Sequence, residues 1–169
     1  MTIDIFKQRR SIKSYKPEQI KDSELDAILE AGTYAPTGLN LQSPVIVVIQ
    51  DRETIDKIGQ LNAEAGGRSG DPFYGAPTLC VVFGDTTKNT YLEDASLVIG
   101  NMLNAAAAIG VGGCWIHRAK EVFKTSYGKE LMQKWGLGDN YIGVGNCILG
   151  YADTTPPTKP RKENYIIRA

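Results

Sequence analysis

The feature that most constrains the fold is an uncharged segment that runs from Ala95 to Ile116. It is long enough to suggest a membrane span, since a spanning helix needs about 20 apolar residues. However, it contains two asparagines and four glycines, and three of these glycines lie near its end. We therefore predict a buried helix over residues 91–109 and a strand over 111–116. Because this helix is apolar on nearly every face, a second subunit could cover part of it.

The other apolar runs predict a central sheet. Val45–Ile49 is a continuous β-branched run, which is typical of a strand buried on both faces. Two further strands are predicted at 78–83 and 141–151, which gives about four strands in all. Helices are predicted at 2–9, at 23–32 after a capping box formed by Ser23 and Asp26, at 53–65, and as one or two helices at 119–135. We expect a single α+β domain over residues 1–169.

The segments between these elements contain proline and glycine. Loops are predicted at 34–44 and 66–77. The tail, 152–169, begins as a proline-rich linker and ends in the short apolar run Tyr165–Arg168, which resembles a strand. Because residues 153–163 cannot pack a core of their own, we expect an extended arm that embraces a second subunit.

Charge and cysteine content exclude several classes of protein. The chain has 19 basic and 19 acidic residues among 169, so a broad nucleic-acid surface is not expected. The three cysteines, Cys80, Cys114 and Cys147, are widely spaced, and no two of them form a CxxC motif. This pattern favours reduced thiols in a cytoplasmic protein. No apolar run follows the N-terminal charges, so we expect no signal peptide and no membrane association.

Three familiar kinds of site are disfavoured. A Cys₃His zinc site would need His117, but Cys114 and His117 lie three apart in a predicted strand and would face opposite sides, so no metal is expected. A hydrolytic triad would need the same histidine and lacks a GxSxG elbow. The glycine-rich runs "GVGGCW" and "GVGNCILG" lack GxGxxG spacing and predict tight turns rather than a dinucleotide fold.

The strongest candidate site is a basic cluster near the N-terminus. Five basic side chains lie between residues 6 and 17, and Arg9, Arg10, Ser11 and Lys13 are the core of the cluster. A phosphate monoester carries a charge of about −1.5 to −2 and offers three acceptor oxygens. Guanidinium groups, a lysine and a hydroxyl match those oxygens. The alternative interpretation is a solvated basic surface.

Two other segments could complete such a site. A second basic cluster in the arm, formed by Lys159, Arg161 and Lys162, would share one phosphate with the first if the arm returned to it. In the 34–44 loop, Pro36, Thr37 and Gly38 would let the backbone approach a planar ring, and the amides of Asn40 and Gln42 could bind the polar edge of a heterocycle.

Taken together, these features resemble the FMN-dependent nitroreductase family. Five motifs occur in the family's order along almost the whole chain: "RRSIKSY", "APTGLNLQSPVIVVI", "YGAPTLCVVF", "YLEDASLVIGNMLNAAAAIGVGGCWI" and "KPRKE". The resemblance implies a nitroreductase-like fold, with a mostly antiparallel sheet flanked by helices and a C-terminal arm, 152–169, that adds to the partner subunit. It also implies a homodimer with FMN at the interface and NADH or NADPH as co-substrate.

The resemblance assigns a role to each candidate residue. Arg9, Arg10, Ser11 and Lys13 would bind the phosphate and the pyrimidine edge of the flavin, and Lys159 and Arg161 would close the phosphate site. Pro36, Thr37, Gly38 and Asn40 of the other subunit would line the ring, with Gln42 at its edge. The backbone of Trp115, Ile116 and His117 would approach the reactive side. No catalytic side chain is implied, but Lys13 would stabilise the reduced flavin.

The implied activity is ping-pong hydride transfer from NAD(P)H through flavin N5 to a nitroaromatic, a quinone or a similar small acceptor. The chain departs from the family pattern in three ways. Lys13 replaces an arginine, which loses a fork but keeps the charge. Ser43–Pro44 replaces a tryptophan segment and the chain is short, and these two departures affect substrate choice. Alternatives are a flavin carrier or sensor, a flavin-degrading or dehalogenating relative, and an interaction domain without a cofactor. Neither the acceptor, the choice between NADH and NADPH, nor a lid role for 66–77 follows from the sequence.

Overall fold

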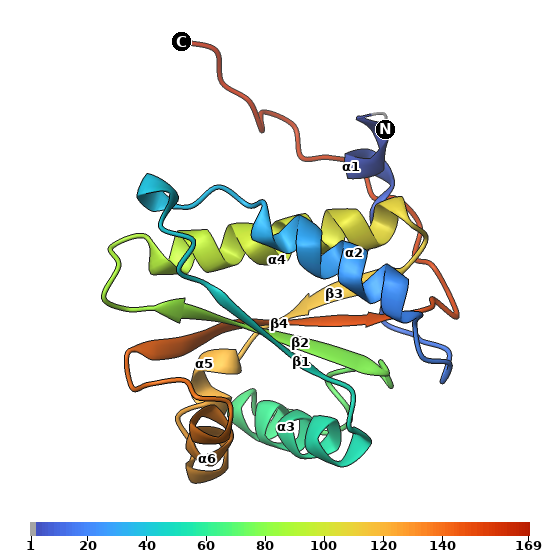
Figure 1. The fold of residues 1–169 in the computed structure, drawn as a ribbon. Helices are drawn as coiled ribbons and strands as arrows, with labels where there is room; N and C mark the ends of the chain where they lie inside the picture. The colour runs from blue at the N-terminus through green and yellow to red at the C-terminus, as the bar shows by residue number, and fades with distance from the viewer. Residues whose placement is uncertain (1–2) are drawn as a thin grey trace.

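The computed structural model describes residues 3–169 and is built around one antiparallel sheet (Figure 1). Its strands are β1 (Val45–Ile49), β2 (Thr78–Asp85), β3 (Gly112–Ile116) and β4 (Tyr141–Gly150), in the spatial order β1-β2-β4-β3. The two central strands, β2 and β4, are buried along most of their length, as expected for strands covered on both faces. The predicted sheet of four strands is confirmed.

Two helices cover one face of the sheet (Figure 1). They are α2 (Asp22–Thr33) and α4 (Tyr91–Ala108), and both contribute to one apolar core with β2 and β4. Ile28, Ile99 and Met102 are fully buried there. Burial of such a side chain stabilises the fold by about 1.5–3 kcal/mol. The uncharged segment is therefore a buried helix and a strand, as predicted.

Other helices cover the opposite face of the sheet (Figure 1). They are α3 (Arg52–Ala65), α5 (Ala119–Val122) and α6 (Ser126–Lys134). This second core includes an edge-to-face aromatic pair, Phe83 and Phe123, whose ring centroids are 4.9 Å apart. Such pairs contribute about 0.5–1.5 kcal/mol beyond the area they bury. The sheet is thus the middle layer of three.

Both ends of the chain attach to the same part of the sheet. After helix α1 (Asp4–Gln8), Ser11 forms a parallel bridge with Gly113, and Tyr15 forms an antiparallel bridge with Ala152. Helix α1 and the C-terminus consequently lie on the same side of the molecule (Figure 1). This arrangement places the N-terminal basic cluster beside the start of the arm.

A few predicted elements differ from the structure. The capping box at Ser23 and Asp26 is wrong: α2 begins at Asp22, and the Glu24 carboxylate accepts a hydrogen bond from the backbone of Lys21 at 3.1 Å. Glutamate reaches back to this donor, whereas Ser23 already lies inside the helix. Of the helix predicted at 2–9, residue 2 lies outside the described residues.

The end of the arm has no regular structure in this chain. Residues 165–168 form no strand in this single chain, and Tyr165, Ile166 and Ile167 are exposed. Their pairing with a partner subunit stays a prediction.

Between residues 3 and 169, no helix combines the length and apolar character that a membrane crossing requires.

Candidate functional site

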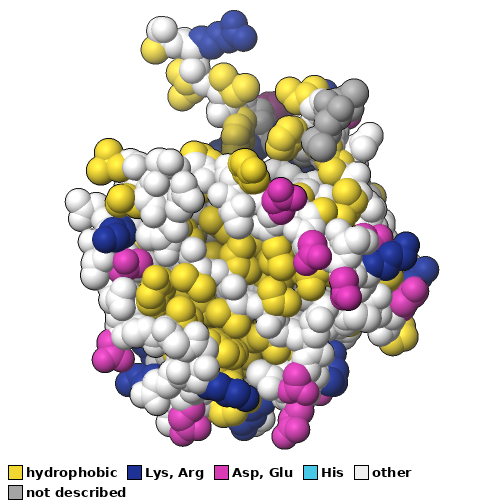
Figure 2. Space-filling model, viewed as in Figure 1, with side chains coloured by type: hydrophobic (Ala, Val, Ile, Leu, Met, Phe, Trp, Pro, Cys, Tyr) yellow, Lys and Arg dark blue, Asp and Glu magenta, His cyan; other side chains and the backbone are white. Residues whose placement is uncertain are grey.

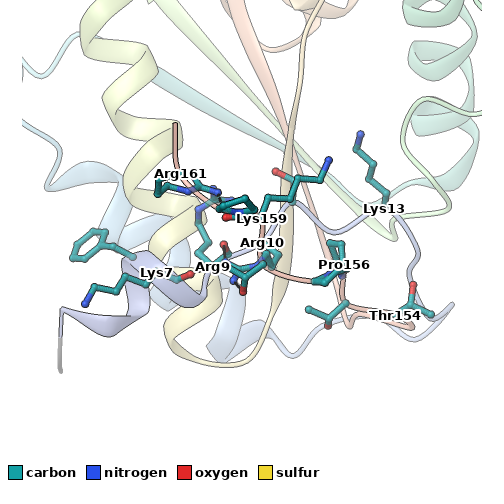
Figure 3. A pocket seen from close by; sticks show the side chains of 14 residues that line it. Lys7, Arg9, Arg10, Lys13, Thr154, Pro156, Lys159 and Arg161 are labelled. Carbon is teal, nitrogen blue, oxygen red and sulfur yellow. Dashed lines mark hydrogen bonds between the residues drawn. The ribbon is translucent and has the colours of Figure 1, made fainter. Parts of the chain in front are cut away.

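The two ends of the chain form the walls of one cavity of about 890 Å³ (Figure 3). Six cationic side chains line it, and none of the described lining residues carries a carboxylate. The cations are Lys7, Arg9, Arg10, Lys13, Lys159 and Arg161. Such a concentration of like charge is unfavourable unless an anion or solvent screens it. The cavity is therefore suited to a polyvalent anion.

Short backbone contacts place the N-terminal cluster in this wall. Arg9 caps α1, and its N–H donates to the carbonyl of Ile5 at 2.9 Å. The next turn of chain is fixed because Ile12 is buried and its N–H donates to the carbonyl of Gly113 at 3.1 Å. Arg9 and Arg10 are therefore held half-buried at the edge of the sheet.

The C-terminal arm returns to the first cluster, as predicted. The N–H of Asp153 donates to the carbonyl of Ser14 at 3.0 Å, and the Ser14 hydroxyl donates to the Asp153 carboxylate at 3.1 Å. Farther along, the Arg10 guanidinium donates to the Thr158 hydroxyl. Lys159 and Arg161 then reach the cavity, whereas Lys162 is not among the residues that line it.

A second cavity of about 500 Å³ adjoins the first through Lys13. Trp115, Ile116 and His117 lie along it, together with the loop that follows α3. The Lys13 ammonium lies 5.7 Å from the ring centroid of Tyr74, within the range of a cation–π contact. The predicted 115–117 segment and Lys13 are thus brought together.

Two buried amides hold the end of β3, and the sequence analysis missed both. The carbonyl of His117 accepts a hydrogen bond from Asn62 Nδ2 at 2.7 Å, and that of Ile116 accepts one from Asn146 Nδ2 at 3.2 Å. The next residue, Arg118, has a left-handed backbone with φ of 77°. A polar residue within the apolar strand at 141–151 was the available signal for Asn146.

The 36–42 loop lies elsewhere in the same chain. Gly38–Asn40 form a short 3₁₀ turn, η1, near the start of α4, where the Gly38 N–H donates to the Asp94 carboxylate at 3.0 Å. By contrast, Ala107 near the end of α4 lines a pocket with Arg9 and Arg10. Thirteen residues of helix separate Asp94 from Ala107, a distance of about 20 Å. Within one chain, Pro36, Thr37, Gly38, Asn40 and Gln42 therefore do not join the basic cavity.

Buried groups near the site are held in their neutral forms. Burial raises the pKa of the Cys114 thiol, while the Ser11 hydroxyl and the charges on Lys13 and Arg9 act in the opposite direction. Burial also raises the pKa of Cys80 to about 12, and all three thiols are free and buried. Among residues 3–169 no group of three potential metal ligands is found. The site contains charges and amides rather than an activated nucleophile.

Several known proteins are similar to this chain in sequence. The sequence model described as "Nitroreductase family" matches residues 6–71, which include both the basic cluster and the 36–42 loop. The chain is 29% identical over 150 residues to an NADH dehydrogenase from Thermus thermophilus, covering 84% of this chain and 63% of that protein. It is 26% identical over 180 residues to an NADPH-flavin oxidoreductase from Vibrio harveyi, covering 98% and 72%.

A crystal structure of a nitroreductase with bound FMN from Bacteroides fragilis has the same fold. The TM-score is 0.88 at 26% sequence identity, and the match covers 99% of this chain and 97% of that one. The matched region includes the sheet, both helical layers and nearly all of the arm. In its fold, its motifs and its relatives, this chain is similar to proteins of the nitroreductase family.

Proposed function

We propose that this chain is an NAD(P)H-dependent FMN oxidoreductase. The observation that carries the proposal is the cavity in which six cations from opposite ends of the chain meet without a carboxylate among the described lining residues. Support also comes from relatives whose names state that they are an NADPH-flavin oxidoreductase and an FMN reductase that uses NAD(P)H.

The residues of the cavity fit the phosphate end of FMN. Arg9, Arg10, Lys159 and Arg161 would bind the phosphate oxygens, and the Ser11 hydroxyl would add a donor. Arg10 is already oriented by the carbonyls of Lys7 and Arg9, which accept from its Nη1 at 2.6 and 2.7 Å. When bound, FMN supplies hydride acceptance from a nicotinamide and electron release to an acceptor.

The second cavity is proposed as the place where the substrates enter. Lys13 connects it to the phosphate site, so its ammonium would lie beside the ring and favour negative charge there. The amides of Asn62 and Asn146 fix the backbone of residues 116–117 at its wall. If nicotinamide and acceptor use this cavity in turn, the kinetics are ping-pong, with parallel double-reciprocal lines. A nitroaromatic or quinone acceptor suits a flavin face of this kind.

A homodimer would complete the ring-binding half of the site. The 36–42 loop and the basic cavity of one chain are separated by about 20 Å of helix, so one flavin cannot contact both. The outer side of α4 also leaves Leu92 and Leu97 about half exposed, at 51% and 46%. We propose that a second copy packs on this side and places its 36–42 loop over the flavin.

The edge of the sheet offers a place for the partner's arm. In residues 3–169 no strand pairs with the outer edge of β1, and Val48 is exposed there. Figure 2 shows hydrophobic side chains gathered in the middle of the face on which β1 lies. The arm carries exposed Tyr165, Ile166 and Ile167, which match such an edge. We propose that Tyr165–Arg168, at the end of the arm, adds to the partner's sheet, while residues 152–161 stay at the cavity of their own chain.

An absorption spectrum of the purified protein under anaerobic conditions tests the proposal. We expect flavin bands that bleach within the time of mixing with NADH or NADPH and return when a quinone is added. Bands that persist with both nicotinamides would indicate a flavin carrier or sensor instead. A colourless protein that takes up no added FMN would contradict the proposed cofactor. Sedimentation of the same sample tests the dimer.

A further inference from the structure

We propose that Asp94 is a positioning residue that holds the 36–42 loop in the shape needed to cover a flavin bound by the partner subunit. This inference rests on the proposed function. Asp94 lies in the first turn of α4, far along the helix from the cations of its own chain. It would therefore act on the flavin through the loop, across the dimer interface.

The contacts of Asp94 join the loop to the helix. The side chain is only 3% exposed, and each carboxylate oxygen has a different donor. Oδ1 accepts from the N–H of Gly38 at 3.0 Å, and Oδ2 accepts from the Thr90 hydroxyl at 2.9 Å. A buried carboxylate costs free energy unless it is hydrogen-bonded, so these two contacts are needed to retain it.

The loop that Asp94 holds has a strained backbone. Leu39, Asn40 and Gln42 have φ values of 52°, 54° and 50°, in the left-handed region that residues other than glycine rarely adopt. Each such residue costs on the order of 1 kcal/mol or more, and strain of this kind persists only where surrounding contacts fix it. Leu39 is also 93% exposed, so no contact of its own side chain within the chain accounts for this conformation.

Two further contacts fix the loop from within. The Gln42 N–H donates to the Thr37 hydroxyl at 3.1 Å, and Gln42 Nε2 donates to Asn40 Oδ1 at 3.1 Å. Gly38 packs directly on Thr90, where an added Cβ would lie 2.3 Å from the hydroxyl oxygen. The exposed surface of the loop is thus preformed, and Asp94 is its attachment to the body of the protein.

The first test compares FMN affinity in two matched variants of the full-length protein. Asp94→Asn keeps the shape of the side chain but replaces one acceptor with an N–H₂ group. We expect FMN binding, followed by flavin fluorescence, to weaken about tenfold. Asp51→Asn is the control, because Asp51 also accepts from one backbone N–H and one threonine hydroxyl, both of Thr54, at the start of α3. It should bind FMN as the wild type does.

The second test uses mixed dimers and asks whether Asp94 acts across the interface. Two variants, Arg10→Ala and Asp94→Asn, are co-expressed with different tags, and the dimer carrying both tags is isolated. If each site takes Arg10 from one chain and the loop from the other, one site carries both defects and the other carries neither. We therefore expect half the FMN of the wild-type dimer, bound with wild-type affinity.

The outcomes separate this inference from the proposed function. A wild-type protein that binds no FMN overturns both. If the wild type binds FMN and Asp94→Asn binds it equally well, the positioning role is wrong while the proposed function stands. If both sites of the mixed dimer bind FMN more weakly than the wild type, the loop acts within its own chain and the inference is again overturned. Loss of stability alone would leave the half-stoichiometry of the mixed dimer unexplained.

Discussion

The basic cavity and the 36–42 loop are built in opposite ways. The cavity is lined by long cationic side chains, two of them on an extended arm without regular structure. The loop offers backbone and uncharged side chains, and a buried carboxylate fixes it to α4. Charge acts over a distance and tolerates flexible side chains, whereas close contact with a planar ring needs a preformed surface. The two halves should therefore respond differently to mutation.

The largest expected effect is in the cavity. Arg10→Ala removes a guanidinium that already contacts Thr158 of the arm and two carbonyl groups. A hydrogen bond to a charged group contributes about 1.5–3 kcal/mol, so FMN affinity should fall about 10- to 100-fold. Equilibrium dialysis measures this loss. Lys16→Ala is the control, since Lys16 lies in the same segment but not among the residues that line the cavity. Full retention of flavin by Arg10→Ala would exclude Arg10 as a ligand.

A smaller effect is expected when the loop is overpacked. In Gly38→Ala the new Cβ would meet the Thr90 hydroxyl at 2.3 Å, so the loop must move. Overpacking costs about 1–3 kcal/mol, and we expect about tenfold weaker FMN binding by fluorescence titration. Adding Thr90→Ala removes the obstructing atom but also one donor to Asp94, so it should restore only part of the affinity. If the double variant binds no better than Gly38→Ala, the contact with Thr90 does not set the loop position.

Replacing Lys13, which lies where the two cavities meet, should modestly change the midpoint potential of bound flavin rather than the affinity for FMN. Its side chain is exposed, and an exposed charge contributes up to about 1 kcal/mol. Lys13→Met should make the midpoint potential of bound flavin more negative by about 20 mV, because 30 mV corresponds to about 1.4 kcal/mol for two electrons. Potentiometric titration against reference dyes measures the change. A shift in the positive direction would show that Lys13 does not favour the reduced form.

The smallest effect, on stability rather than on FMN binding, is expected at a turn that belongs to neither the basic cavity nor the 36–42 loop. Hydrogen bonds from Asn140 and Thr87 lower the pKa of Asp85 at the end of β2. Because this pKa is lower in the folded state, the stabilisation is present above the ordinary carboxyl pKa of about 4 and is lost as the pH falls below it. Urea denaturation from pH 5 to pH 3 should therefore show a weaker pH dependence in Asp85→Asn than in the wild type. If the free energy of unfolding falls equally steeply with pH in both proteins, Asp85 does not contribute to the loss of stability in acid.

The sequence predicted the parts of this molecule that depend on local pattern. The β-branched run at 45–49 and the uncharged segment at 95–116 form the strand and the helix–strand pair that their composition indicates. The basic residues at both ends were found because like charges cluster visibly. Their meeting in one cavity was predicted from an arm that returns, and the structure brings them together.

The groups that hold the site were harder to predict, because they act through the backbone. Asp94 was visible only as the last charged residue before the uncharged segment, and Asn62 was one polar residue in an amphipathic helix. Their partners are a backbone N–H and a backbone carbonyl more than 50 residues away. Such contacts leave no periodic signal, since any residue type supplies the backbone group. The capping prediction was wrong for a local reason: Lys21 rather than Ser23 is the N-cap, and Glu24 rather than Asp26 accepts from the N-cap backbone N–H.

The attachment of residues 11–16 to the sheet also has a consequence for the order of folding. Ser11 pairs with Gly113, and Tyr15 with Ala152, across more than 100 residues of chain. Contacts of such long range form last, because the entropy lost on closing the long loop between them must be offset by structure that has already formed. The anion site would accordingly assemble after the sheet. A phosphate-bearing ligand would then stabilise the contacts that form in the final step of folding. Its binding would slow proteolysis of the two chain ends more than proteolysis of the core.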